Sequence, residues 1–137
     1  MRFLICLYFF SLNVLLCSAQ DEQDPYEGMD GAKVMFSEDR ADLGDIRQGD
    51  KVVHIFKFRN SGNQALVIEN VLTTCGCTVP EWPKKPLAPG EVGQLKVVFD
   101  STGKIGRQNK TITMRSNALG QFHRVRIAAM VMPPHKE

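Results

Sequence analysis

Short runs of alternating apolar and polar residues, separated by turn residues, constrain the fold of this chain most strongly. In the run 51–59, the side chains of Val52, His54, Phe56 and Phe58 share one face of an extended strand, and the intervening residues face the other way. Comparable runs cover residues 32–36, 65–72, 93–100, 110–115 and 122–131. No long stretch has helical spacing. The pattern therefore predicts an all-β domain of six or seven short strands packed as a two-sheet sandwich.

The alternation also predicts which side chains form the core. We expect the following residues to be buried: Leu66, Ile68, Val71, Leu95, Val97, Phe99, Ile112, Met114, Val125, Ile127, Ala129 and Val131. The step from Ile68 to Val71 breaks strict alternation, which predicts a bulge or bend. Asn60 and Gly62 are predicted to occupy a turn that needs positive φ, and Pro89-Gly90 is predicted to form a tight turn.

The first nineteen residues have the composition of a secretory signal peptide. Arg2 gives a basic start, residues 3–16 are mostly apolar, and Ser18-Ala19 supplies small residues for cleavage. This predicts a signal helix, cleavage after Ala19, and export to the periplasm or cell envelope with no membrane span afterwards, because the apolar run is shorter than the ~20 residues that cross a bilayer. The alternative is a lipoprotein anchored through Cys17, which Leu16 disfavours because the preceding residue is normally small.

Charge divides the remaining chain into a leader and a domain. Residues 20–31 contain five acids and no base, together with Pro25, Gly28 and Gly31, and are predicted to form an acidic flexible linker. The domain is expected over residues 32–133, followed by a tail over 134–137. Residues 31–137 hold sixteen basic and ten acidic residues that interleave along the strands. Because they form no basic stripe, we expect no nucleic-acid partner.

Five sequence blocks resemble a known family. In chain order they are Asp42-Leu43-Gly44-Asp45-Ile46, Phe56 to Gly62, Thr74-Cys75-Gly76-Cys77-Thr78, Leu87 to Glu91, and Ser116-Asn117. Together they closely resemble the bacterial exported family known as domain of unknown function 1573, over roughly residues 34–131, and the Thr-Cys-Gly-Cys-Thr block is the most specific of them. The resemblance implies a single immunoglobulin-like β-sandwich of about seven antiparallel strands and a location in the envelope. It implies no activity.

Cys75 and Cys77 are the one pair of residues that could carry chemistry. After signal cleavage they are the only cysteines left. Cα atoms two residues apart in a strand are separated by about 6.5 Å, near the upper limit for a disulfide, so a bond would need a turn, which Gly76 is expected to permit. Four alternatives remain open: a structural disulfide or inert thiols, a redox-active pair, a soft-metal site for copper(I) or zinc, and intermolecular disulfides.

The loop after the cysteines is a second candidate, for partner binding. Trp82 is either a binding aromatic or a plug that packs the loop down, and Lys84 and Lys85 would lower a thiol pKa if the loop folded back. His54 is expected to be packed or at an edge, His123 to point outward, and His135 to lie in the tail, so none is predicted as a metal ligand.

Catalytic motifs of the phosphate-loop, serine-elbow and paired-histidine kinds are missing from the sequence. We therefore expect a non-enzymatic module without a cofactor that binds or scaffolds an unidentified envelope protein, with thiol redox or soft-metal binding at Cys75 and Cys77 as the alternative.

Overall fold

The structure, a computed structural model, describes residues 23–136 of the chain. Within this part there are eight strands and no helix. The strands are β1 (Val34–Phe36), β2 (Arg40–Arg47), β3 (Lys51–Asn60), β4 (Ile68–Thr73), β5 (Thr78–Glu81), β6 (Val92–Asp100), β7 (Gly106–Ser116) and β8 (Phe122–Met132). The predicted signal helix and Cys17 lie outside the described residues.

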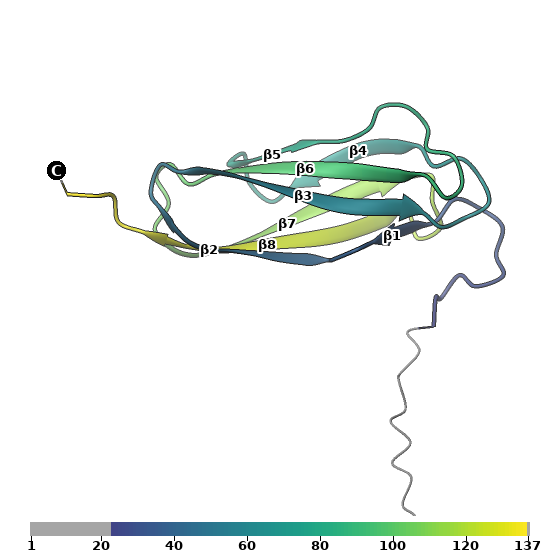
Figure 1. Cartoon of the computed structure of the whole chain (residues 1–137), viewed down its shortest axis with the longest axis horizontal. Coiled ribbons are helices and arrows are strands. Elements are labelled where there is room, and N and C mark those ends of the chain that lie inside the picture. The colour runs from purple at the N-terminus through teal and green to yellow at the C-terminus, as the bar shows by residue number, and fades with distance from the viewer. Residues whose placement is uncertain (1–22, 137) are drawn as a thin grey trace, which may run out of the picture.

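The strands form two four-stranded sheets, which Figure 1 shows as two layers. The strand order is β1-β3-β6-β5 in one sheet and β2-β8-β7-β4 in the other. The predicted all-β sandwich is thus confirmed. Its details differ from the expectation of about seven antiparallel strands, because there are eight and β2 runs parallel to β8. The chain crosses from one sheet to the other between β1 and β2. β2 therefore lies beside β8, the last strand, and runs in the same direction.

Two strands were missed by the sequence pattern. β2 has few apolar residues, and its alternation is broken by Gly44, which has a φ of 71°, and by a register shift between Asp42 and Asp45. β5 is only four residues long and contains Pro80. The strand predicted from residue 65 starts at Ile68, and the predicted bulge is confirmed by a register shift before Asn70.

The core lies between the two sheets and contains the side chains that the alternation predicted, together with others it did not predict, among them Ala41, Ile46 and Leu87. All twelve predicted residues are buried, and Phe56, Leu95 and Ile112 have no exposed surface. Burial of such a side chain contributes about 1.5–3 kcal/mol relative to its exposure. The sandwich is therefore held together by apolar packing between strands that are far apart in the sequence.

The turn after β3 is built differently from the prediction. Neither Asn60 nor Gly62 has a positive φ. Asn60 is fully buried, and its amide donates hydrogen bonds to the carbonyl oxygens of Gln64 and Leu87 at 2.7 and 3.0 Å. A Cβ atom at Gly62 would overlap the backbone of Gly31, so close approach is what requires glycine there. The tight turn at Pro89-Gly90 is confirmed, with a φ of 83° at Gly90.

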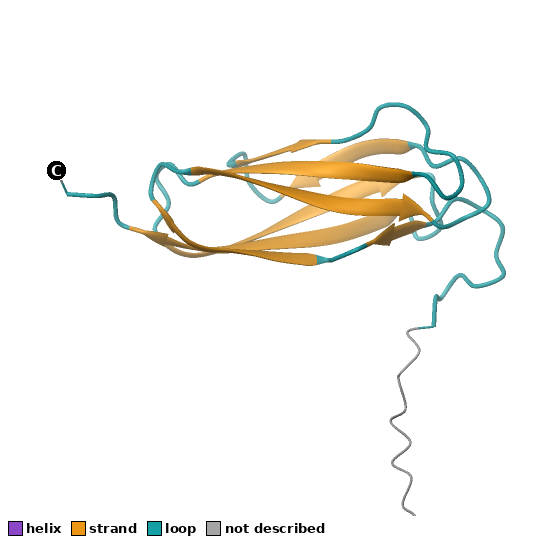
Figure 2. Cartoon of the chain, in the orientation of Figure 1, coloured by secondary structure: helices purple, strands orange, loops and turns teal. Residues whose placement is uncertain are grey.

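The two ends of the described chain leave the sandwich at opposite ends (Figures 1 and 2). The segment before β1 lies against the end where β3 finishes. Asp24 forms an ion pair with Lys33 at 3.3 Å, and Asn63 donates a hydrogen bond to Asp30 at 2.7 Å. These contacts attach the second half of the predicted linker to the domain. The opposite end carries the connection from β4 to β5, where the cysteines lie.

Candidate functional site: the disulfide turn and its groove

Cys75 and Cys77 occupy the short connection that carries the chain from one sheet to the other. β4 belongs to one sheet and β5 to its partner, so the turn bridges the two layers at the rim of the sandwich. The two sulfur atoms form a disulfide, with Cα atoms 5.3 Å apart. The turn is closed by the Thr78 amide, which donates to the Cys75 carbonyl at 3.3 Å. Gly76 does not have a left-handed φ and has open space around it, so the expected conformational role of this glycine is wrong.

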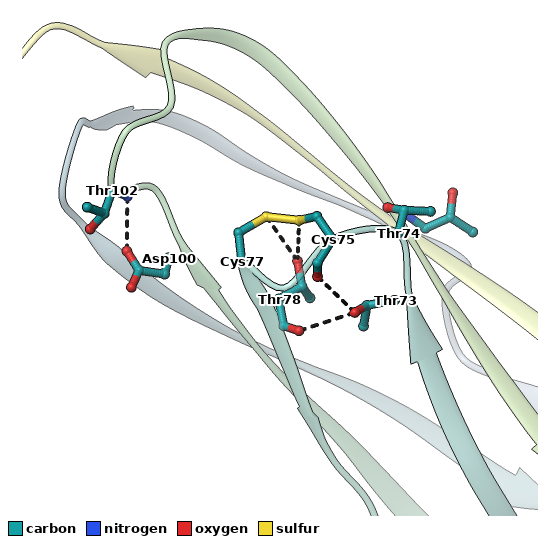
Figure 3. Close-up of a disulfide and its surroundings, with 8 residues drawn as sticks. Thr73, Thr74, Cys75, Cys77, Thr78, Asp100 and Thr102 are labelled. Atoms are coloured by element: carbon teal, nitrogen blue, oxygen red, sulfur yellow. Dashed lines mark hydrogen bonds between the residues drawn. A yellow bond between two sulfur atoms is a disulfide. The ribbon is translucent and has the colours of Figure 1, made fainter.

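Three threonines fix the disulfide turn in place (Figure 3). The Thr73 hydroxyl lies 2.9 Å from the carbonyl oxygen of Cys75 and 3.3 Å from that of Thr78. Thr78 is buried, and its hydroxyl oxygen lies 3.9 Å from each sulfur atom. The Thr74 amide donates to the Thr111 carbonyl on β7 at 3.2 Å. Hydrogen bonds to both sheets therefore hold the sulfurs at a defined position.

A groove of about 300 Å³ opens beside the disulfide. It is lined by Lys51, Gly76, Cys77, Val79, Val98, Asp100, Thr102 and Lys104. The Asp100 amide donates to the Cys77 carbonyl at 2.8 Å, which joins the turn to the wall of the groove. The disulfide is therefore a wall of an open site and not part of the closed core.

The charges in this groove are unequal. Lys51 lies 3.9 Å from the Asp100 carboxylate. Hydrogen bonds from the side chain and backbone of Thr102 lower the pKa of Asp100 below its ordinary value, so this carboxyl is ionised at neutral pH. Lys104 forms no ion pair with any acid among residues 23–136. Two ammonium groups against one carboxylate leave the groove net positive.

An apolar row extends from the groove over the outer face of the β1-β3-β6-β5 sheet. Val79 on β5 pairs with Val98 on β6, and Val98 pairs with Val53 on β3, so the three valines lie side by side across three strands. Val79 is 56% exposed and Val53 is 51% exposed. Most outward positions of a solvated sheet are polar, so this row is a departure from the usual alternation.

Further apolar side chains lie toward the other end of the same face, beyond the outward pair of Lys57 and Gln94. Ile55 lies on β3 before that pair, and Met35 and Val92 flank Arg59 on neighbouring strands. Met35, Val92, Lys57 and Arg59 contribute to a second cavity of about 300 Å³. Lys57 and Arg59 form no ion pair within the described part of the chain. We call the outward surface formed by Met35, Val53, Ile55, Val79, Val92 and Val98 the valine face.

The loop of Trp82, Lys84 and Lys85 does not fold back onto the cysteines. The Lys84 ammonium sits over the Trp82 ring, 3.1 Å from its centroid, and Lys85 is exposed in the same loop. Trp82 is half-buried and packs against the core. β5 separates this loop from the disulfide by about 13 Å of extended chain, so the sequence neighbours of the cysteines are not their neighbours in space. Lys51 and Lys104, which do line the groove, come from distant segments and gave no sequence signal.

The histidines do not gather around the cysteines. The Nε2 atom of His54 lies 2.7 Å from the Glu38 carboxylate. The prediction that His123 points outward is wrong, because His123 shares the inward face of β8 with Val125. Its buried Nε2 atom has no hydrogen-bond partner among the described residues. Within residues 23–136, no group of three or more His, Cys, Asp and Glu side chains is placed to hold a metal ion. The same residues contain no helix that is long and apolar enough to cross a bilayer.

Solved structures with a similar fold define the class of this domain as an immunoglobulin-like, PapD-like β-sandwich. The seventh PapD-like domain of human CEP192 matches with a TM-score of 0.63 at 8% identity, over 77% of this chain and 89% of that domain. A Porphyromonas gingivalis protein of unknown function matches with a TM-score of 0.64 at 17% identity, over 72% of this chain. This chain spans 46% of the length of that protein.

The chain belongs to the family described as protein of unknown function (DUF1573), whose model matches residues 34–131. A search with the sequence finds no matching curated protein. The secreted serine protease VesC from Vibrio cholerae also shares the fold, with a TM-score of 0.56 at 15% identity, over 72% of this chain but only 23% of the protease. At these identities the similarities establish the fold alone.

Proposed function

We propose that this chain is a non-enzymatic binding module of the bacterial cell envelope, which holds an exported protein on the valine face. The observation that carries the proposal is the row of Val79, Val98 and Val53, which leaves apolar side chains in water across three adjacent strands. Exposed apolar surface of this extent on a small domain marks a site of association. A strand or loop of a partner laid across the row would remove it from water.

Charge suggests the chemistry of the partner. Glu81 and Asp100, the acids at the margin of this face, already pair with Lys96 and Lys51 at 3.5 and 3.9 Å. Lys57 and Arg59 are left without acidic partners among the described residues. The expected partner segment is therefore apolar with acidic residues toward its Lys57 end, since complementary charge sets orientation and association rate.

The sheet edge next to the disulfide is a poor place for a partner strand. The Asp100 amide donates to the Cys77 carbonyl, so Cys77 faces β6 with its backbone groups. In an antiparallel pair, every second residue turns its N–H and C=O away from the partner strand. The backbone groups of Thr78 and Pro80 therefore point toward the free edge of β5. Pro80 has no N–H to donate, and the Thr78 N–H is used by Cys75. Such a blunted edge does not accept a further strand, which directs association to the face of the sheet.

Site-specific photocrosslinking in the native host tests the proposal. A photoreactive amino acid at Val53 or Val79 should give adducts with the same exported protein, identified by mass spectrometry, and that purified protein should bind the domain directly. The matched control is the same amino acid at Arg124, which is exposed on the outer face of the other sheet. Absence of adducts at Val53 and Val79, or equal adducts at all three positions, would contradict the proposal.

A second candidate function, thiol–disulfide exchange, is favoured by one specific observation: the disulfide lines an open, positively charged groove and not the core. A disulfide that a thiolate can reach is able to exchange, whereas a buried one is inert. Incubation of the protein with a neutral thiol such as 2-mercaptoethanol should open the Cys75–Cys77 bond in the folded state. Opening only above the unfolding transition would exclude this function.

A further inference from the structure

We propose that Cys77 is the sulfur attacked in exchange, and that the groove selects thiols carried by acidic peptide segments of exported proteins. This inference rests on the second proposed function and assigns it a direction and a substrate class. It is carried by the position of the groove relative to the two sulfurs and by the charges that line it. It does not depend on which protein occupies the rest of the valine face.

The direction of attack follows from the place of the groove. Cys77 lines the groove, whereas Cys75 does not. A thiolate displaces one sulfur of a disulfide from the side opposite the other sulfur. Figure 3 shows Cys77 on the side of Asp100 and Thr102, which are groove residues, and Cys75 on the side of Thr73 and Thr74. An incoming thiolate that lies in the groove is therefore in line with the Cys77 end of the bond.

The leaving sulfur also has a defined environment. When the bond breaks, Cys75 departs as a thiolate and needs a hydrogen-bond donor. The Thr78 hydroxyl oxygen lies 3.9 Å from Cys75 Sγ, and Thr78 is buried with its hydroxyl toward the disulfide. This hydroxyl can donate to the thiolate as it forms. It lies equally far, 3.9 Å, from Cys77 Sγ, so it assists the departure of either sulfur and the direction of attack rests on the groove.

The reaction balances with a dithiol as the only co-reactant. The substrate thiolate forms a bond to Cys77 Sγ, the Cys75–Cys77 bond breaks, and its electron pair stays on Cys75. A second thiolate of the substrate then attacks the substrate's own sulfur in the mixed disulfide and releases Cys77 as a thiolate. The substrate dithiol is oxidised to a disulfide, Cys75 and Cys77 are reduced, and the two substrate protons end on the two cysteines.

Lys51 and Lys104 give the groove its preference. They face one acid, Asp100, so an acidic segment is attracted and a basic one is repelled. Val79 and Val98 form the apolar part of the lining, which suits a segment that carries an apolar residue beside its cysteine. These features describe a short acidic peptide with a cysteine near its middle.

Second-order exchange rates with three small thiols test the selectivity. Glutathione is anionic and cysteamine is cationic. 2-Mercaptoethanol is neutral, so its rate measures any change in exchange that does not depend on the charge of the thiol. The rate for glutathione relative to cysteamine, each corrected for thiolate fraction, should fall about fivefold in Lys104→Glu at physiological ionic strength. This is the size expected when one charge about 7 Å from each thiol is reversed in water and salt screening reduces the Coulomb energy to about 40%. The matched control is Lys85→Glu, which makes the same charge change in a loop away from the groove and should leave the ratio unchanged. An equal ratio in wild type and both variants would overturn the selectivity, and a normal thermal melt of each variant shows that folding is intact.

The direction of attack has its own readout. Brief reaction with glutathione followed by iodoacetamide should place glutathione on Cys77 and the acetamide label on Cys75, as read by peptide fragmentation. The reverse assignment would overturn the inference while leaving exchange itself intact. No reaction of folded protein with 2-mercaptoethanol would instead refute the second proposed function, so the two failures are distinguishable.

Discussion

Replacement of both cysteines by serine should cost the domain little stability. The disulfide closes a loop of only three residues, because its cysteines are two positions apart. The chain-entropy relation then gives about 1.6 kcal/mol at 25 °C for loop closure, against about 4.7 kcal/mol for a loop of 100 residues. Lost packing of Cys77, which is only partly buried against the core, brings the expected decrease in the free energy of unfolding to about 2 kcal/mol.

Urea and thermal unfolding of the double variant Cys75→Ser/Cys77→Ser measure this quantity. A loss of about 2 kcal/mol corresponds to a decrease in melting temperature of about 9 °C for a domain of this size. Wild-type protein in reductant is the control, because it loses only the loop-closure part. A decrease above about 4 kcal/mol, or failure of the variant to fold, would refute the reasoning, since the disulfide would then stabilise the whole sandwich and not a local turn.

Three further predictions concern the sandwich and its ends. Gly93→Ala should lower the free energy of unfolding by about 1–3 kcal/mol in urea titrations, because the new Cβ would lie 2.6 Å from the Phe58 ring and 3.0 Å from Leu87, and no change would show that the ring moves aside. Asn60→Ala should cost about 2–3 kcal/mol in the same assay, because the buried Asn60 amide bonds to the carbonyls of Gln64 and Leu87 and accepts from the backbone amides of Lys33 and Gly62, and all four bonds are lost. An effect below about 0.5 kcal/mol would contradict this. Burial lowers the pKa of His123 below its ordinary 6.5, so the unfolded chain takes up a proton more readily and stability should fall as pH drops through about 6.5. His123→Asn should weaken that dependence between pH 7.5 and 5.5, and an identical pH profile in wild type and variant would contradict the assignment.

The long strands were predictable because each has one buried and one solvated face. β3, β6 and β8 keep this alternation over most of their length, so periodicity alone located them and their core side chains. For β7 it located only residues 110–115, because the first half of that strand carries no buried side chain. β2 and β5 were not predictable in this way. β2 owes its place to pairing with the last strand of the chain, and β5 is held by β6 despite Pro80, so both depend on partners far away in the sequence.

The candidate site was predictable only in part. The spacing of Cys75 and Cys77 identified the pair, but the sequence left a disulfide, free thiols and a metal site open. The groove joins Cys77 to Lys51 and Lys104, which lie 26 positions before it and 27 positions after it, and no local pattern connects them. The valine face was hidden for another reason. Val53, Val79 and Val98 occupy outward positions of three strands, and only the register of those strands places them side by side.

The most direct test of the valine face is the affinity of the crosslinked partner, once purified, for wild-type protein and two variants. Val53→Glu puts a charge in the middle of the row, and Thr111→Glu puts the same charge on the outer face of the other sheet. Calorimetric titration should give a dissociation constant at least about tenfold higher for Val53→Glu, since loss of about 1.4 kcal/mol is tenfold in affinity, and within twofold of wild type for Thr111→Glu. Equal affinities for wild type and Val53→Glu would contradict the account, because the partner would then bind elsewhere on the domain.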